Sequence, residues 1–168
     1  MITVRRAEPA DATALVALAT VVSTEPEGWM IWNEWRSAGE ERRYLRAVRK
    51  HPDAAVLVAE LDGRIVGRLS LARDPHPASH HVADLGLMVD GGFRRRGVGR
   101  ALLAAAAEWG REHGIEKLEL HVFPWNEPAL GLYTSFGFER EGYRKRHYER
   151  GGELVDAILM AYFVDASG

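Results

Sequence analysis

The sequence predicts a mixed α/β (α+β) fold in which helices cover one central sheet. Three observations indicate it. Segments with the period-two alternation of strands are interspersed with longer segments whose apolar residues recur at helical spacing. The pair Asp62-Gly63 separates two β-like segments, which is a strong hairpin signal. The strand-like segment Leu85 to Val89 leads through a glycine-containing turn into an amphipathic stretch from Val98 to His113, which predicts a strand–turn–helix unit.

The first half of the chain predicts one strand, two helices and three further strands. Pro9 opens the first helix, and Leu15, Leu18 and Val22 share one of its faces. The second helix stops before Pro52, because the residue before a proline avoids helical geometry. In chain order we expect a strand at 2–5, helices at 9–22 and 40–50, and strands at 54–61, 64–71 and 82–89.

The second half predicts two helices that alternate with strands. Gly114 ends the helix that begins at Val98, and Gly137 ends the next one, since glycine adopts the left-handed conformation that closes a helix. The expected elements are a helix at 98–113, a strand at 117–123, a helix at 128–136, and strands at 138–148 and 153–164. Together the two halves predict about seven strands and four helices.

Size and composition limit the function classes. A chain of 168 residues favours one domain, spanning 1–168, and its net charge of −2 gives no general attraction for nucleic acid or membrane. Without cysteine there can be no disulfide and no thiolate zinc site. The histidines show no metal-ligand spacing, so no metal is expected. The first residues lack a signal-peptide core and the apolar runs are too short to span a bilayer, so we expect a cytoplasmic protein.

The turn from Arg94 to Arg100 predicts an anion site. A helix start exposes unpaired N–H groups and a partial positive charge, and both suit phosphate. Gly97 and Gly99 lack a Cβ, so a diphosphate can approach the backbone, and four arginines add positive charge. Three other interpretations stay open: the glycines serve only the loop, the arginines form a solvated or nucleic-acid-binding patch, or the turn binds a dinucleotide. The third glycine of a dinucleotide motif is replaced by Leu102, and no P-loop ending is present.

Two motifs in order resemble those of the GNAT superfamily of acyl-CoA-dependent N-acetyltransferases. The first is R-x-x-G-x-G at 94–99, and the second is N-x-x-A-x-x-x-Y-x-x-x-G-F at 126–138. One helix and one strand lie between them, as in that family, and the resemblance covers nearly the whole chain. Gly91-Gly92 departs from it, because relatives commonly have a proline before the aromatic residue.

The resemblance implies a mostly antiparallel sheet, splayed between the strands at 85–89 and 117–123, with acetyl-CoA (coenzyme A) as the acyl donor. The acyl-pantetheine arm would enter the splay. The residues expected at the donor are Leu87, Met88 and Val89 at the pantetheine amides, Arg94, Arg95, Arg96, Gly97, Val98, Gly99 and Arg100 around the pyrophosphate, and Asn126, Ala129, Leu130 and Tyr133 along the pantetheine wall.

Acyl transfer to an amine requires an acid and a base. The amine must lose a proton before it attacks, and the departing thiolate benefits from a proton donor. The resemblance places Tyr133 as the acid and the N–H of Met88 or Val89 at the oxyanion. Asp84 lies where many relatives have a glutamate; being shorter, it would act as base through water. His80 or His81 is an alternative base, and His81 is also a candidate acceptor-site residue.

The acceptor is less defined than the donor. Trp29, Trp32 and Trp35 are candidates for the acceptor pocket, although their spacing also fits a packed helical stripe. Three functions stay open for the protein. They are acetylation of a small-molecule primary amine such as an amino acid, acetylation of a protein amino terminus or lysine, and non-catalytic acyl-CoA binding. Family habit suggests a homodimer through the final strands.

Overall fold

The computed structural model describes residues 1–31 and 34–164. Its seven strands form one sheet in the order β1-β2-β3-β4-β5-β7-β6. The strands are β1 (Ile2–Arg6), β2 (Ala54–Leu61), β3 (Arg64–Arg73), β4 (Val82–Val89), β5 (Lys117–Val122), β6 (Glu139–Arg150) and β7 (Glu153–Phe163). The helices are α1 (Ala12–Ser23), α2 (Ala38–Lys50), α3 (Val98–Glu112) and α4 (Glu127–Phe136). The predicted fold class and element order are confirmed.

Element boundaries differ from the prediction mainly at helix starts. Pro9–Asp11 forms a separate 3-10 turn before α1 rather than its first turn. Helix α2 begins two residues before the expected Glu40, because the Ser37 side chain caps it by accepting a hydrogen bond from the Glu40 N–H at 3.2 Å. Strand β6 continues to Arg150, beyond the expected residue 148.

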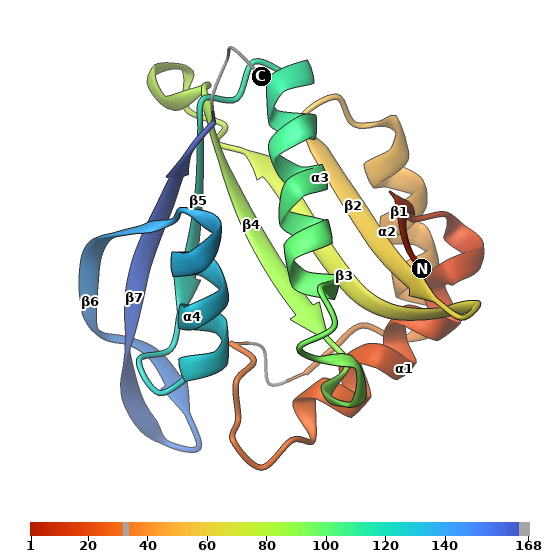
Figure 1. Cartoon of the computed structure of the whole chain (residues 1–168), viewed down its shortest axis with the longest axis horizontal. Helices are drawn as coiled ribbons and strands as arrows, with labels where there is room; N and C mark the ends of the chain where they lie inside the picture. The colour runs from red at the N-terminus through yellow and green to blue at the C-terminus, as the bar shows by residue number, and fades with distance from the viewer. Residues whose placement is uncertain (32–33, 165–168) are drawn as a thin grey trace.

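The helices lie in two layers, one on each face of the sheet (Figure 1). Helices α3 and α4 cover one face, where Leu85, Leu102 and Leu120 belong to the larger apolar core. Helices α1 and α2 cover the other face, where Val58 and Met88 belong to a second core. Successive residues of a strand point to opposite faces, so β4 contributes to both cores.

The sheet splays between β4 and β5, its only parallel neighbours among the described strands. Their pairing covers only Val82–Asp84 against Lys117–Glu119. Beyond these residues the two strands diverge, as Figure 1 shows, whereas β4 stays paired with β3 as far as Val89. The edge of β4 that faces β5 is therefore unpaired after Asp84, and the splay that the resemblance implied is present.

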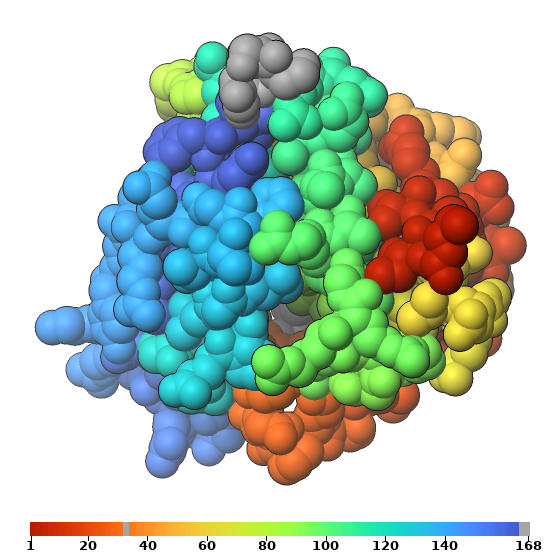
Figure 2. Space-filling model, in the orientation of Figure 1, coloured from red at the N-terminus to blue at the C-terminus, as the bar shows by residue number. Residues whose placement is uncertain are grey.

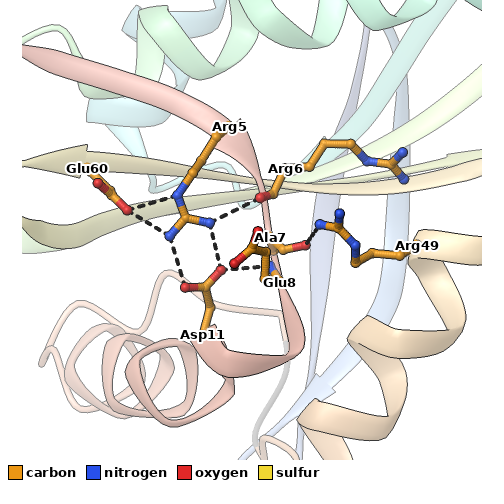
Figure 3. A network of polar contacts seen from close by, with 7 residues as sticks. All are labelled: Arg5, Arg6, Ala7, Glu8, Asp11, Arg49 and Glu60. Atoms are coloured by element: carbon orange, nitrogen blue, oxygen red, sulfur yellow. Dashed lines mark hydrogen bonds and ion pairs between the residues drawn. The ribbon is translucent and has the colours of Figure 1, made fainter.

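A polar network fixes the α1 and α2 layer to the sheet (Figure 3). The Arg5 guanidinium on β1 donates to both carboxylate oxygens of Asp11 at 2.8 and 2.9 Å, and to Glu60 on β2 at 2.7 and 2.9 Å. The hydrogen bond from Arg5 lowers the pKa of Asp11. Arg49 of α2 donates to the Ala7 carbonyl at 2.9 Å. Val22 of α1, in this layer, lines the cavity described next.

Within the described ranges, no helix combines the length and the apolar character needed to cross a bilayer.

Candidate active site

A cavity of about 880 Å³ occupies the splay and reaches both faces of the sheet. Its lining comes from β3, β4, β5 and β6, from the turn before α3, from α4, and from the segment between α1 and α2. Figure 2 shows the hollow between α4 and the turn before α3. Segments that are far apart in the sequence therefore meet around one space.

The turn before α3 presents the anion site that the sequence predicts. Gly97 is the N-cap residue with φ of 86°, and Arg95 has φ of 63°, so two left-handed residues shape the turn. No side chain caps α3, whereas Ser37 caps α2 and Asn126 caps α4. The first N–H groups of α3 thus lack a side-chain acceptor within the described residues, as an incoming phosphate requires.

Gly99 has a packing role that the sequence did not reveal. A Cβ there would lie 2.6 Å from the Leu132 Cδ2 atom, so the absence of a side chain lets α3 approach α4 closely. Gly97 and Gly99 both line the cavity, as do Val98, Arg95 and Arg100. The motif therefore serves the shape of the cavity wall as well as access to the backbone.

The four arginines of the turn lie in different environments. Arg94 donates to Glu25 at 2.6 and 2.7 Å and to the Val89 carbonyl at 2.9 Å, so internal partners hold its guanidinium. Arg96 lies 5.6 Å from the Phe93 ring and is absent from the lining of the main cavity. Arg95 and Arg100 are left as the arginines that reach the cavity without an internal ion pair. The phosphate roles of all four stay predictions.

Helix α4 supplies the wall opposite the turn. Asn126 caps it by accepting from the Ala129 N–H at 3.2 Å, and both residues line the cavity. Leu130 packs against the larger core and is not part of the cavity lining. The predicted contact between Leu130 and the donor is therefore the least supported of this group.

Tyr133 reaches the cavity from within the larger core. It is 6% exposed and packs against Phe138 with ring centroids 5.4 Å apart. Burial raises the pKa of its phenol far above the ordinary value, so the hydroxyl stays protonated at neutral pH. The described part of the chain gives this hydroxyl no hydrogen-bond partner. These properties suit a proton donor aimed into the cavity.

Asp84 lies on the opposite face of the sheet from Tyr133. Its neighbour Leu85 packs in the core beneath α3 and α4, and Asp84 therefore faces the α1 and α2 side, as Met88 does. The Asp84 side chain is solvent-exposed because it opens into the cavity, whose protein walls separate it from bulk water. This partial desolvation raises its pKa to about 6, and the negative charges of Glu119 and Asp74 contribute further. A carboxylate with that pKa is a usable base at neutral pH.

The sequence interpretation missed a histidine that lines the same cavity as Asp84. His121 follows Glu119 by two residues on β5, and Glu119 is the register partner of Asp84. Its Nδ1 atom lies 2.6 Å from the hydroxyl of Tyr148, and both side chains line the cavity. Burial, followed by the positive charges of Arg144 and His147, lowers the pKa of His121. Leu118, Leu120 and Val122 alternate along β5 and point into the larger core, so residue 121 must point to the opposite face of the sheet, as Asp84 does. This alternation was the sequence signal that could have identified His121.

The segment between α1 and α2 closes the cavity on the sheet face that α1 and α2 cover. Trp29 and Trp35 line it, whereas Trp32 lies outside the described residues. The helical spacing of the tryptophans was misleading, because the described part of 24–36 contains no helix. Arg150 of β6 donates to the carbonyls of Gly28 and Met30, the latter at 2.8 Å, and so anchors the segment.

His81 does not reach this cavity. It is an exposed residue just before β4, and its carbonyl accepts from the backbone N–H of Glu116 at 2.8 Å. Across 1–31 and 34–164 there is no cluster of three or more acidic or histidine side chains suited to a metal ion.

A sheet splayed between two parallel strands, with an uncapped helix start on one side and a carboxylate on the other, is the arrangement that the resemblance to acyl-CoA-dependent acyltransferases implied. The model of the acetyltransferase (GNAT) family matches residues 21–138, and the chain belongs to this family. It is therefore an N-acetyltransferase that takes its acyl group from acetyl-CoA.

Individual relatives agree with this assignment. The chain is 41% identical to L-amino acid N-acetyltransferase AaaT of Escherichia coli over 66% of its own length and 68% of that protein. It is 36% identical to an N-alpha-acetyltransferase of Sulfurisphaera tokodaii over 67% and 71% of the two lengths. The structure of a GNAT acetyltransferase from Streptococcus pneumoniae superposes with a TM-score of 0.88, at 28% identity, covering 98% of this chain and 100% of the other.

Proposed function

We propose that the enzyme acetylates the amino group of a free amino acid or a related small primary amine by direct attack on acetyl-CoA. The observation that carries this proposal is the single cavity through the sheet, which connects the start of α3 to Asp84. The anchored segment at 28–30 bounds the acceptor side, which favours a small acceptor over a long chain. The similarity to an L-amino acid N-acetyltransferase supports the same acceptor class.

In this proposal the donor lies across the splay. The uncapped N–H groups of α3, together with Arg95 and Arg100, hold the diphosphate. The β4 edge at 87–89 is unpaired toward β5 and offers backbone groups to the pantetheine amides. The N–H of Met88 or Val89 donates to the carbonyl oxygen as negative charge develops.

Protons leave and arrive on opposite faces of the sheet. Asp84, through a water molecule, accepts the proton that the ammonium group must lose before its nitrogen attacks the acyl carbon. As the new C–N bond forms and the C–S bond breaks, the nitrogen loses its second proton to water and Tyr133 donates its phenolic proton to the departing sulfur. Water then returns a proton to the Tyr133 phenolate, so the turnover yields the amide, the CoA thiol and the one proton taken up by Asp84. The hydrogen-bonded pair His121 and Tyr148 lines the same cavity as Asp84 and is the second candidate for the acceptor's proton.

A thiol-release screen tests the acceptor class. Purified enzyme with acetyl-CoA is offered free amino acids, polyamines, aminoglycosides and peptides, and liberated CoA thiol is measured. We expect at least one free amino acid or similarly small amine to give the highest kcat/KM. A preference for peptides over every small amine would contradict the proposal.

Acetylation of a protein amino terminus is the second candidate, since an N-alpha-acetyltransferase is 36% identical over 67% of this chain. It predicts that peptides with different amino-terminal residues outcompete free amino acids at equal concentration. Mass spectrometry of the acetylated product would locate the acetyl group.

We further propose that residues 1–168 act as one domain in a cytoplasmic homodimer. Strand β6 is an edge strand, and Tyr143, Leu154 and Phe163 are exposed large side chains on the β6–β7 pair. Gel filtration with light scattering measures the assembly, and a Leu154→Glu variant that stays dimeric would place the interface elsewhere.

A further inference from the structure

A buried arginine lies on the acceptor face of the sheet. Arg68 of β3 is 4% exposed and is the register partner of Met88, so it faces the α1 and α2 side, as Asp84 does. Its Nη2 atom donates to the Glu41 Oε1 atom over a long 3.5 Å, and the Tyr44 side chain is a further, uncharged neighbour. Glu41 is held more closely by Arg36, at 2.8 Å.

This cluster has one positive charge in excess. Two guanidinium groups, Arg36 and Arg68, share the single carboxylate of Glu41. Arg36 is partly exposed to solvent, whereas Arg68 and Glu41 are not. A buried cation is costly unless an anion and hydrogen-bond acceptors surround it. The weakly paired Arg68 therefore lacks a full complement of acceptors.

Two hydrogen-bond donors near Arg68 have no acceptor, and their chemistry indicates which kind of ligand would bind there. Within the described residues, the buried side-chain nitrogens or oxygens without a hydrogen-bond partner are the Arg68 Nε and Trp35 Nε1 atoms. Both residues line the cavity, and the Arg68 guanidinium lies 4.9 Å from the Trp35 ring. Each of these atoms carries an N–H and can only donate. Two such donors beside an excess positive charge favour a ligand that carries an anionic oxygen.

We propose that Arg68 and Trp35 bind the α-carboxylate of an amino-acid acceptor. This inference rests on the proposed function and narrows the acceptor to amines that carry a carboxylate. A guanidinium is planar and presents paired donors that match a carboxylate, and the indole N–H adds a further donor.

The register supports this position for the acceptor. Along one face of the sheet, Arg68, Ser70 and Ala72 of β3 pair with Met88, Gly86 and Asp84 of β4. Arg68 is thus four residues from the level of Asp84, or about 13 Å along the strand. An α-amine is one carbon from its carboxylate, so an acid group at Arg68 directs the amine toward Gly86, with room for a water molecule before Asp84.

The test compares matched substrates on matched variants. The best free amino acid from the thiol-release screen is assayed beside its α-carboxamide, which keeps the amine and side chain but loses the charge. Arg68→Met removes the guanidinium and keeps much of its length. We expect kcat/KM for the acid to fall by about 30-fold or more, as for loss of a buried charged partner, while kcat/KM for the carboxamide changes less than about threefold.

Two milder variants keep the test valid if Arg68→Met does not fold. Arg68→Lys retains the charge without the planar donors, and Trp35→Phe removes only the indole N–H. Each should lower kcat/KM for the acid by about 2- to 13-fold, the range of a single hydrogen bond, and lower it less for the carboxamide, whose oxygen is an uncharged and weaker acceptor. The KM for acetyl-CoA and the melting temperature of each variant serve as controls for the donor site and the fold.

The outcomes separate the two proposals. Selective loss of the acid substrate supports carboxylate binding by Arg68 and Trp35. If the wild-type enzyme acetylates free amino acids but the variants lose acid and carboxamide equally, the carboxylate assignment is overturned and the proposed function stands. If the wild-type enzyme acetylates no free amino acid, both the assignment and the amino-acid acceptor are overturned.

Discussion

At the scale of single residues, the raised pKa of Asp84 determines the pH at which it can act as a base. Its pKa of about 6 has burial as the first cause, with Glu119 and Asp74 adding like charge. Only the ionised form accepts a proton, so kcat/KM should rise with pH through about 6 and then level off. We expect Asp84→Asn to lose this limb together with about 10²- to 10⁴-fold of kcat/KM, measured as a pH profile of thiol release.

Glu119→Gln is the matched control for Asp84. It removes a nearby negative charge without touching the base, so the ascending limb should move to lower pH while the plateau rate is kept. An Asp84→Asn enzyme with an unchanged profile would transfer the base role to another group, with His121 as the first to examine.

Tyr133 provides the second residue-scale prediction. Tyr133→Phe keeps the ring that packs against Phe138 and removes only the hydroxyl, so the melting temperature should change little. If the phenol protonates the departing sulfur, kcat should fall by about 10²-fold or more while the KM for acetyl-CoA stays within a few-fold. Steady-state thiol release measures both constants, and full activity of the variant would refute the acid role.

The sequence located these two side chains better than it located their surroundings. The family resemblance selected Tyr133, whose acid role stays a prediction, and strand periodicity correctly put Asp84 on the face of Met88. His121 was missed because its importance arises only when β4 and β5 run parallel for three residues and bring Glu119 beside Asp84. Arg68 was missed because its burial depends on α2, which is distant in the sequence.

At the scale of elements, local signals predicted the order of helices and strands. Glycines, prolines and apolar periods act within a few residues, so they identified elements and erred mainly at their ends. The segment around Trp29 and Trp35 was harder, because Arg150, far along the chain, anchors it without a helix. Arg94 likewise was expected at the phosphates, yet Glu25 of the segment after α1 holds its guanidinium.

The turn before α3 supports an element-scale prediction with a built-in control. Gly97 and Gly114 flank α3, and both have positive φ, 86° and 71°. Replacing either with alanine should lower the free energy of unfolding by about 1–2 kcal/mol, the cost of a left-handed L-residue. Only Gly97→Ala should also raise the KM for acetyl-CoA, because only Gly97 lines the cavity. Urea unfolding measures the change in stability, and acetyl-CoA titrations measure the KM. If Gly97→Ala and Gly114→Ala had the same KM for acetyl-CoA, Gly97 would have no role in donor binding.

At the scale of the whole molecule, the sheet divides the proposed donor site from the proposed acceptor site. Tyr133 and the start of α3 lie on one side, Asp84 and Arg68 on the other, and the cavity through the splay connects them. This arrangement follows from one topological fact, the short parallel pairing of β4 and β5. Because strand pairing is a long-range property, only the resemblance to a known family could indicate the splay before the structure was available.

Donor binding across the splay should stabilise both halves of the sheet together. At an acetyl-CoA concentration about 100 times Kd, mass action adds about 2.7 kcal/mol, which corresponds to a rise of about 5–10 °C in melting temperature for a chain of this size. Acetyl-pantetheine at the same concentration lacks the diphosphate that the start of α3 would bind, so its shift should be much smaller. Scanning fluorimetry measures both shifts. Equal shifts would mean that the uncapped start of α3 contributes nothing to donor affinity, and the phosphate site would have to be sought elsewhere along the cavity.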